Sequence, residues 1–159
     1  MGKIHNNEIT IVNQTGYQME FFGEWFDSGR VADGNCWPHT IGNGEKATIL
    51  CYERDWAWAG CSGYVQYRLC GDRTKILTIG FSNPSVGNNK VGVGFTGKQV
   101  WDNMTSNNYR QHQFSQSGFS AVFHCTGGET NVCRVELGSD HPSITAAISL
   151  HSSSLICIP

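Results

Sequence analysis

The chain has 159 residues, 15% of them charged, and a formal net charge of −2 at pH 7. This length suits one domain over residues 1–159 with an ordinary hydrophobic core, and the composition argues against disorder despite 19 glycines. The 11 basic side chains form no cluster, so a nucleic-acid partner is not expected.

Short segments with apolar and polar residues in alternation follow one another along the chain. Residues 8–13 (EITIVN) and 17–26 (YQMEFFGEWF) come first. The later strand-like segments are 46–52, 62–70, 75–82, 90–95, 118–125, 131–137 and 143–150, with Gly, Asn and Asp turns between them. Many short, evenly spaced strands indicate an all-β fold, and we predict a single-domain antiparallel β-sandwich. At most one short helix is expected, near residues 99–109.

Catalytic and metal-binding patterns are missing from the sequence. It has no G-x-S-x-G, H-E-x-x-H or P-loop motif, and the acidic residues are scattered. His124 and Cys125 are adjacent on a predicted strand, so their side chains point to opposite faces and cannot form a catalytic dyad. We therefore predict that the protein is not an enzyme and has no catalytic residue, metal site or cofactor.

The chain contains seven cysteines, an odd number, and no C-x-x-C pair. Two interpretations are open: reduced cysteines that act as small core hydrophobes, or a partial disulfide set in an exported protein. The first residues contain no secretion leader and no apolar run reaches the ~18 residues of a membrane span. These features favour reduced cysteines, in a protein that is cytoplasmic or released by a route without a signal peptide.

Trp56 and Trp58 stand in a stretch, ERDWAWAGCSG (53–63), that otherwise reads as a loop. If the stretch is extended, the two indoles share one face. They then form either a platform for a sugar ring, a choline headgroup or a bilayer interface, or a plug for the hydrophobic core.

Several motifs occur in the order in which similar motifs occur in actinoporins, which are cytolysins whose β-sandwich binds sphingomyelin-containing membranes. These motifs are ITIVNQTG, WFDSG, GCSGYVQYRL, ILTIGFSNP and TGKQVWDNM, and they cover residues 9–109. The segments VNQTG, DSGR and FSNPSVGNNK also resemble aegerolysins, another group of small lipid-binding β-sandwiches. The chain thus resembles an actinoporin-like or aegerolysin-like sandwich.

The resemblance implies a set of headgroup-binding residues. Ser28, Ser62, Ser82 and Pro84 fall at positions that line the phosphocholine pocket of actinoporins, and Tyr109 matches one of its tyrosines. Hydroxyl groups suit phosphate oxygens, and aromatic faces suit a quaternary ammonium.

Three departures from the actinoporin pattern qualify what the resemblance implies. The amphipathic pore-forming helix that precedes the sandwich in actinoporins has no counterpart. Residues 85–94 carry no aromatic side chain, and Thr105 and Arg110 stand where tyrosines are expected. Trp56 and Trp58 would then replace the missing aromatics.

The sequence therefore predicts a recognition protein that binds membrane lipid headgroups of the sphingomyelin or phosphocholine type through loops at one end of the sandwich. A role as the binding component of a cytolytic or defence system, with a second, pore-forming component, is a variant of this function. The alternatives are a lectin that binds glycans on the same fold and a structural protein that self-assembles, as a homo-oligomer, through its sheet edges.

Overall fold

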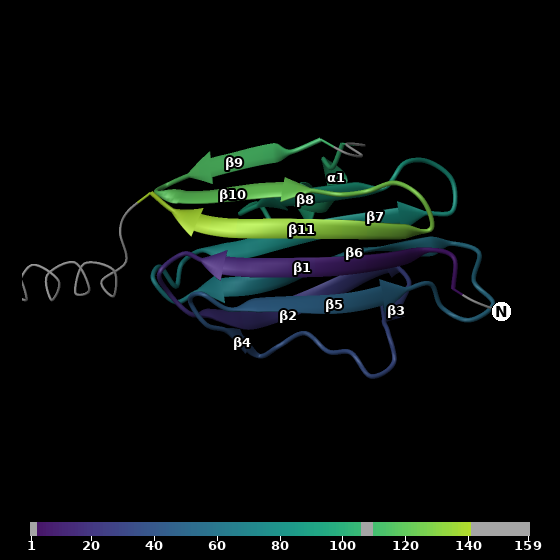
Figure 1. The fold of residues 1–159 in the computed structure, drawn as a ribbon, viewed down its shortest axis with the longest axis horizontal. Helices are drawn as coiled ribbons and strands as arrows, with labels where there is room; N and C mark the ends of the chain where they lie inside the picture. The colour runs from purple at the N-terminus through teal and green to yellow at the C-terminus, as the bar shows by residue number, and fades with distance from the viewer. Residues whose placement is uncertain (1–2, 106–109, 141–159) are drawn as a thin grey trace, which may run out of the picture.

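Two β-sheets face each other across a shared apolar core in the computed structural model of the chain, which describes residues 3–105 and 110–140 (Figure 1). The first sheet contains, in spatial order, β3 (Arg30–Val31), β5 (Lys46–Tyr52), β1 (Asn6–Gln14), β11 (Thr130–Ser139), β10 (Phe119–His124) and β9 (His112–Gln116). The second contains β4 (Thr40–Ile41), β2 (Met19–Ser28), β6 (Gly60–Leu69), β7 (Ile76–Pro84) and β8 (Lys90–Gly94). A short helix, α1 (Lys98–Asp102), lies against β7 and β8.

The alternation of residue types explains why these segments form half-buried strands. In β1 every second side chain is buried, including Ile9 and Ile11, and the residues between them are partly exposed. Tyr67 of β6 and Phe81 of β7 are the largest side chains that are completely enclosed in the core. The predicted all-β sandwich is confirmed.

One strand pair departs from the predicted antiparallel arrangement. β1 and β11 run parallel over their whole length, with Ile9 opposite Cys133 and Ile11 opposite Val135. The two strands lie far apart in the sequence, so no tight turn joins them and nothing forces an antiparallel pairing. Every other strand pair in the described residues is antiparallel.

Most predicted segments match strands to within a few residues, and 46–52 coincides with β5. The sequence analysis missed β3 and β4, which have two residues each, and β9, whose sequence HQFSQ has a single apolar residue. The predicted helix is present but short, since α1 spans only Lys98–Asp102. The segment 143–150 lies outside the described residues.

No disulfide joins any two of the six cysteines in the described residues, and four of them are buried: Cys51, Cys61, Cys125 and Cys133. Burial raises the pKa of the Cys61 and Cys125 thiols to about 11, so both remain protonated at neutral pH. The four buried cysteines fit the first interpretation, small core hydrophobes, whereas Cys36 is exposed and Cys70 is half-buried.

One end of the sandwich gathers segments that are distant in the sequence. Asn6 pairs with Tyr52 in β5 and with Thr130 in β11, and Gly60 pairs with Pro84. The N-terminal segment 3–5, the loop 53–59, the β7–β8 turn 85–89 and the β10–β11 turn 125–129 therefore meet at this end, on the right in Figure 1. We call it the tryptophan end.

Candidate functional site

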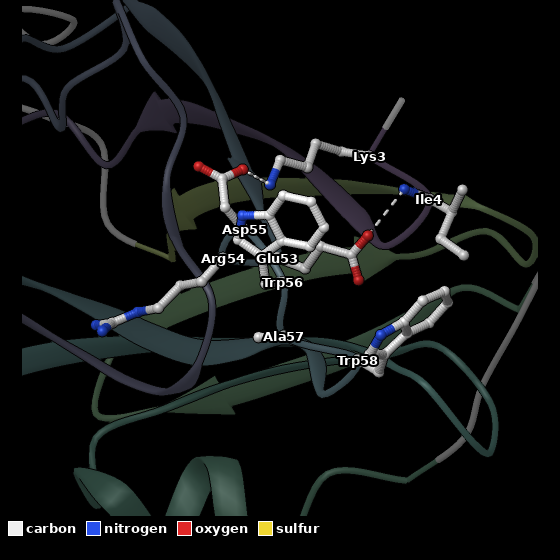
Figure 2. A pocket seen from close by; sticks show the side chains of 8 residues that line it. All are labelled: Lys3, Ile4, Glu53, Arg54, Asp55, Trp56, Ala57 and Trp58. Carbon is white, nitrogen blue, oxygen red and sulfur yellow. Dashed lines mark hydrogen bonds and ion pairs between the residues drawn. The ribbon is translucent and has the colours of Figure 1, made fainter. Parts of the chain in front are cut away.

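The loop 53–59 presents its two tryptophans to solvent (Figure 2). Trp56 is 96% exposed and Trp58 is 74% exposed, so neither fills the core. The loop turns at Asp55–Trp56, where the Ala57 amide donates to the Arg54 carbonyl at 3.3 Å and Trp56 has a φ of 62°. The stretch is therefore not extended at this point, and the condition under which both indoles would share one strand face is not met.

A pocket of about 300 Å³ lies between this loop and the N-terminal segment. Lys3, Ile4 and residues 53–58 line it. Both tryptophans belong to this lining, so the turn brings the two indoles to one site although it does not place them on one strand face.

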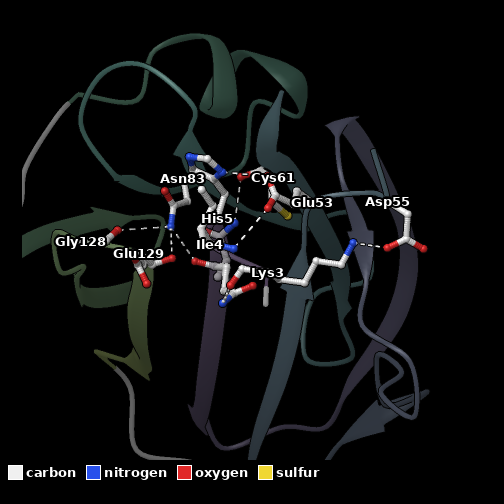
Figure 3. Close-up of polar contacts among 11 residues, drawn as sticks. Lys3, Ile4, His5, Glu53, Asp55, Cys61, Asn83, Gly128 and Glu129 are labelled. Atoms are coloured by element: carbon white, nitrogen blue, oxygen red, sulfur yellow. Dashed lines mark hydrogen bonds and ion pairs between the residues drawn. The ribbon is translucent and has the colours of Figure 1, made fainter. Parts of the chain in front are cut away.

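Three polar contacts hold the N-terminal segment against the loop. The Glu53 carboxylate accepts hydrogen bonds from the Ile4 amide at 3.2 Å and from His5 Nδ1 at 2.8 Å (Figure 3). Lys3 Nζ forms an ion pair with Asp55. We call these three contacts the N-terminal clasp. It fixes the position of the first residue of the loop, because Glu53 is itself buried.

The electrostatic state of Glu53 follows from these contacts. Burial raises the pKa of its carboxyl, but the hydrogen bonds from His5 and from the Ile4 amide outweigh burial, and the net result is a pKa below the ordinary value of 4.5. Glu53 is therefore ionised at neutral pH and can hold both donors.

Two further apolar side chains at the tryptophan end are exposed. Val86 in the β7–β8 turn is 89% exposed and Ile4 is 39% exposed. Together with Trp56 and Trp58 they form what we call the apolar rim. Ile4 and Val86 were not predicted as site residues. For Val86 the sequence held a signal, because it is the one apolar residue within the Gly- and Asn-rich turn SVGNN.

Three of the serines named by the resemblance lie side by side. Ser28 of β2 is opposite Ser62 of β6, and Ser62 is opposite Ser82 of β7. We call these three residues the serine row. Pro84 is half-buried at the end of β7, opposite Gly60, and Tyr109 lies outside the described residues. The fold thus brings three of the predicted positions together on one sheet, centred on β6, the strand that follows the tryptophan loop.

An aromatic side chain contacts Ser62, the middle residue of the serine row. Trp101 Nε1 donates a hydrogen bond to Ser62 Oγ at 2.8 Å, and Ser62 and Ser82 are both buried. Trp101 meets Trp25 edge to face, with ring centroids 5.0 Å apart, and Trp25 stacks on Tyr64. Sequence reasoning did not identify Trp25 and Tyr64, although both stand at the outward positions of predicted strands.

A cation already lies on this aromatic group. Lys98 Nζ is 5.2 Å from the Trp25 ring centroid and 5.0 Å from that of Trp101. The geometry fits a cation–π interaction with two indoles. This aromatic group can therefore bind a positively charged group.

Two basic side chains at the tryptophan end, Lys3 and Arg30, have acidic partners, whereas Arg54 bonds a backbone carbonyl. In addition to the clasp, Arg30 pairs with Asp33 at 2.8 Å, and Arg54 Nε donates to the Gly29 carbonyl at 3.3 Å. Within residues 3–105 and 110–140, no three His, Cys, Asp or Glu side chains are grouped so that they could hold a metal ion. No helix in this part of the chain has the length and apolar character needed to cross a membrane.

No family model matches the sequence, and no curated protein matches it. Several solved structures are similar. The lipid-binding protein Nakanori has a TM-score of 0.71 at 16% identity, over 86% of this chain and 72% of that chain. IP-1A from Alcaligenes faecalis has a TM-score of 0.55 at 16% identity, over 87% and 94% of the two chains. RahU, solved with a TRIS molecule, has a TM-score of 0.53 at 10% identity, over 89% and 100%.

At these identities the similarity establishes the fold. The chain shares its β-sandwich with a protein that is named for lipid binding.

Proposed function

We propose that the protein is a non-enzymatic binding protein that attaches to membrane lipid headgroups through the tryptophan end. The observation that carries this proposal is the exposure of Trp56 and Trp58 on one seven-residue loop. Large aromatic side chains are costly in water and are enriched at the boundary between headgroups and acyl chains. The apolar rim adds Ile4 and Val86 to the same end, so four exposed apolar side chains can enter a bilayer interface together.

The charge pattern favours a zwitterionic membrane over an anionic one. Lys3 and Arg30 at the tryptophan end are each paired with an acidic side chain, and the chain as a whole carries a net charge of −2. An excess of basic groups, the usual requirement for anionic lipids, is not available. Binding should therefore depend little on salt.

We infer that the headgroup is of the phosphocholine type, as in sphingomyelin. Ser28, the partly exposed member of the serine row, supplies a hydroxyl group for a phosphate oxygen, and Trp25 and Trp101 supply ring faces for a trimethylammonium group. The position of Lys98 over both rings supports this assignment, because a choline group would take the place of that ammonium. A cytolytic or defence role would require a second component that forms the pore.

The size of the tryptophan contribution can be worked from the structure. A tryptophan buries about 200 Å², so the two exposed fractions, 96% and 74%, correspond to roughly 340 Å². At about 25 cal/mol per Å² and half-depth insertion, this area stabilises the bound state by about 4 kcal/mol. Replacing both side chains by alanine should then weaken membrane partitioning by roughly a thousandfold.

The experiment is co-sedimentation with vesicles of phosphatidylcholine, phosphatidylcholine with sphingomyelin, and phosphatidylcholine with phosphatidylserine, at low and high salt. We expect binding to the first two, stronger with sphingomyelin, and little effect of salt. Trp56→Ala/Trp58→Ala should abolish sedimentation, whereas the control Phe22→Ala, which removes an exposed aromatic from the middle of β2, should not. A correctly folded double variant that sediments like the wild type would refute the proposal.

A further inference from the structure

A second pocket lies at the tryptophan end, on the other side of Ile4 from the tryptophan loop. It has a volume of about 310 Å³, and the N-terminal segment, the β7–β8 turn and the β10–β11 turn enclose it. Its polar lining comes from His5, Asn83, Asn88, Asn89 and Glu129, with glycines from both turns between them. This volume lies at the lower end of the range for small-molecule sites, roughly 300–1,000 Å³. We call it the asparagine pocket.

Two buried amides hold the walls of the pocket together. Asn83 Nδ2 donates to the carbonyls of Asn6 at 2.9 Å and Glu129 at 2.8 Å, with a longer contact to Gly128 (Figure 3). Asn89 Nδ2 donates to the carbonyls of Thr126 at 2.8 Å and Gly128 at 3.0 Å. Both hydrogens of each amide are therefore used within the protein.

The oxygens of the same two amides are left as acceptors. No described residue donates a hydrogen bond to Asn83 Oδ1 or to Asn89 Oδ1. Four polar side-chain atoms of the described residues are fully buried without a hydrogen-bond partner, and neither of these two oxygens is one of them. Solvent therefore reaches both, although the two residues are only 2% and 5% exposed. An acceptor in such a confined place gains from a ligand that donates a hydrogen bond.

The exposed residues Asn88 and Glu129 and the half-buried His5 add both hydrogen-bond donors and acceptors to the lining. Glu129 contributes a carboxylate, and its side chain has no ion pair or hydrogen bond to a described residue. Asn88 contributes an amide with free donors and a free acceptor, and His5 has its second ring nitrogen available because Nδ1 is held by Glu53. A ligand that fits must offer several hydrogen-bond donors and must also accept hydrogen bonds, as a set of hydroxyl groups does.

The same chemistry disfavours other small headgroups. A phosphate would meet the Glu129 carboxylate and two amide oxygens, all of them acceptors. A choline group has no donor and would find no Phe, Tyr or Trp ring in the lining. A simple ammonium would satisfy the acceptors but would leave most of the volume and the donors of Asn88 unused.

We propose that the asparagine pocket binds one neutral sugar residue. Ile4 lines both this pocket and the pocket between the loop 53–59 and the N-terminal segment, so a sugar bound here lies next to the side chains that enter the membrane. The sugar can therefore be free in solution or be the headgroup of a glycosylated lipid. Only the second case rests on the proposed attachment to membranes.

The first test measures free sugars. Saturation-transfer NMR with the methyl glycosides of glucose, galactose, mannose and N-acetylglucosamine should show binding of at least one of them to the wild type. Asn88→Ala/Glu129→Gln should weaken it by at least about tenfold, the factor for losing one hydrogen bond to a charged group. The matched control Asn103→Ala/Asp140→Asn changes exposed residues outside the pocket and should have no effect.

The second test uses phosphatidylcholine vesicles with and without glucosylceramide or galactosylceramide. The glycolipid should strengthen binding of the wild type and of the control, but not of Asn88→Ala/Glu129→Gln. Trp56→Ala/Trp58→Ala should keep its affinity for the free glycoside and lose the vesicles, so a failure of membrane attachment is distinguished from a failure of the pocket.

Three results would overturn the proposal. The first is that none of the four glycosides binds the wild type. The second is that the pocket variant binds the glycoside as the wild type does. The third is that free ethanolamine binds in a manner that depends on Glu129 while the glycosides do not, which would make the pocket an amine site.

Discussion

Removal of the Glu53 carboxylate tests how the tryptophan loop is held. In Glu53→Gln the side chain keeps its shape, but it loses the charge that accepts from the Ile4 amide and His5 Nδ1. Hydrogen bonds to charged groups contribute about 1.5–3 kcal/mol each, and part of that remains with a neutral amide. We expect the free energy of unfolding to fall by about 1–2 kcal/mol in Glu53→Gln and by about 2–4 kcal/mol in Glu53→Ala.

The same variant makes a prediction about pH. The folded pKa of Glu53 lies below its ordinary value of 4.5, so its contribution is fully present above that pH and is lost as the pH falls through the folded pKa. The stability difference between wild type and Glu53→Gln should therefore be constant above about pH 5 and should shrink progressively below pH 4.5. Urea unfolding at a series of pH values, followed by circular dichroism, measures this difference.

The ion pair of the N-terminal clasp provides the control. Asp55 is exposed, and exposed ion pairs contribute little to stability, so Asp55→Asn should change the free energy of unfolding much less than Glu53→Gln does. Equal losses for Glu53→Gln and Asp55→Asn, or a wild-type difference that does not change below pH 4.5, would refute the assignment of the buried Glu53 as the main support of the loop.

Three further predictions concern the supporting structure. Gly60→Ala should destabilise the fold by about 3 kcal/mol or more, because the residue has a φ of 77° and a Cβ there would lie 2.5 Å from the backbone carbonyl oxygen of Asn83. The control Gly34→Ala, with a φ of 76° and open space around it, should lower the free energy of unfolding by only about 1 kcal/mol; urea unfolding measures both. Trp101→Phe loses the hydrogen bond to the serine row and should lower the unfolding free energy by about 1–2 kcal/mol in thermal melts. Iodoacetamide followed by mass spectrometry should modify exposed Cys36 in the native protein and buried Cys133 only after unfolding, because burial raises the pKa of the latter.

The strands could be predicted from the sequence because their signal is local. In KATILCY and SGYVQYRLC the alternation of side chains records which face is buried, and the sandwich follows from the number of such segments. The parallel pairing of β1 with β11 could not be predicted, because it joins two strands that are far apart in the sequence and depends on the arrangement of both whole sheets.

The candidate site was only partly predictable, for a similar reason. Trp56 was conspicuous by its residue type, but its exposure depends on a turn with a positive φ that the residues around it do not specify. The serine row requires the register of three strands, including an irregularity between Phe26 and Ser28. The contact between Glu53 and His5 joins residues that are 48 positions apart, so no local pattern records it.

Fluorescence quenching on vesicles tests the central claim most directly, namely that Trp56 and Trp58 enter the membrane. The sample is the protein on phosphatidylcholine–sphingomyelin vesicles whose acyl chains carry bromine, which quenches tryptophan emission at short range. The wild type should be quenched strongly. Trp56→Phe/Trp58→Phe should still sediment with the vesicles but lose the quenching, because Trp25, Trp37 and Trp101 are partly buried against the sheets. Quenching that is absent in the wild type, or that persists in this variant, would contradict the account.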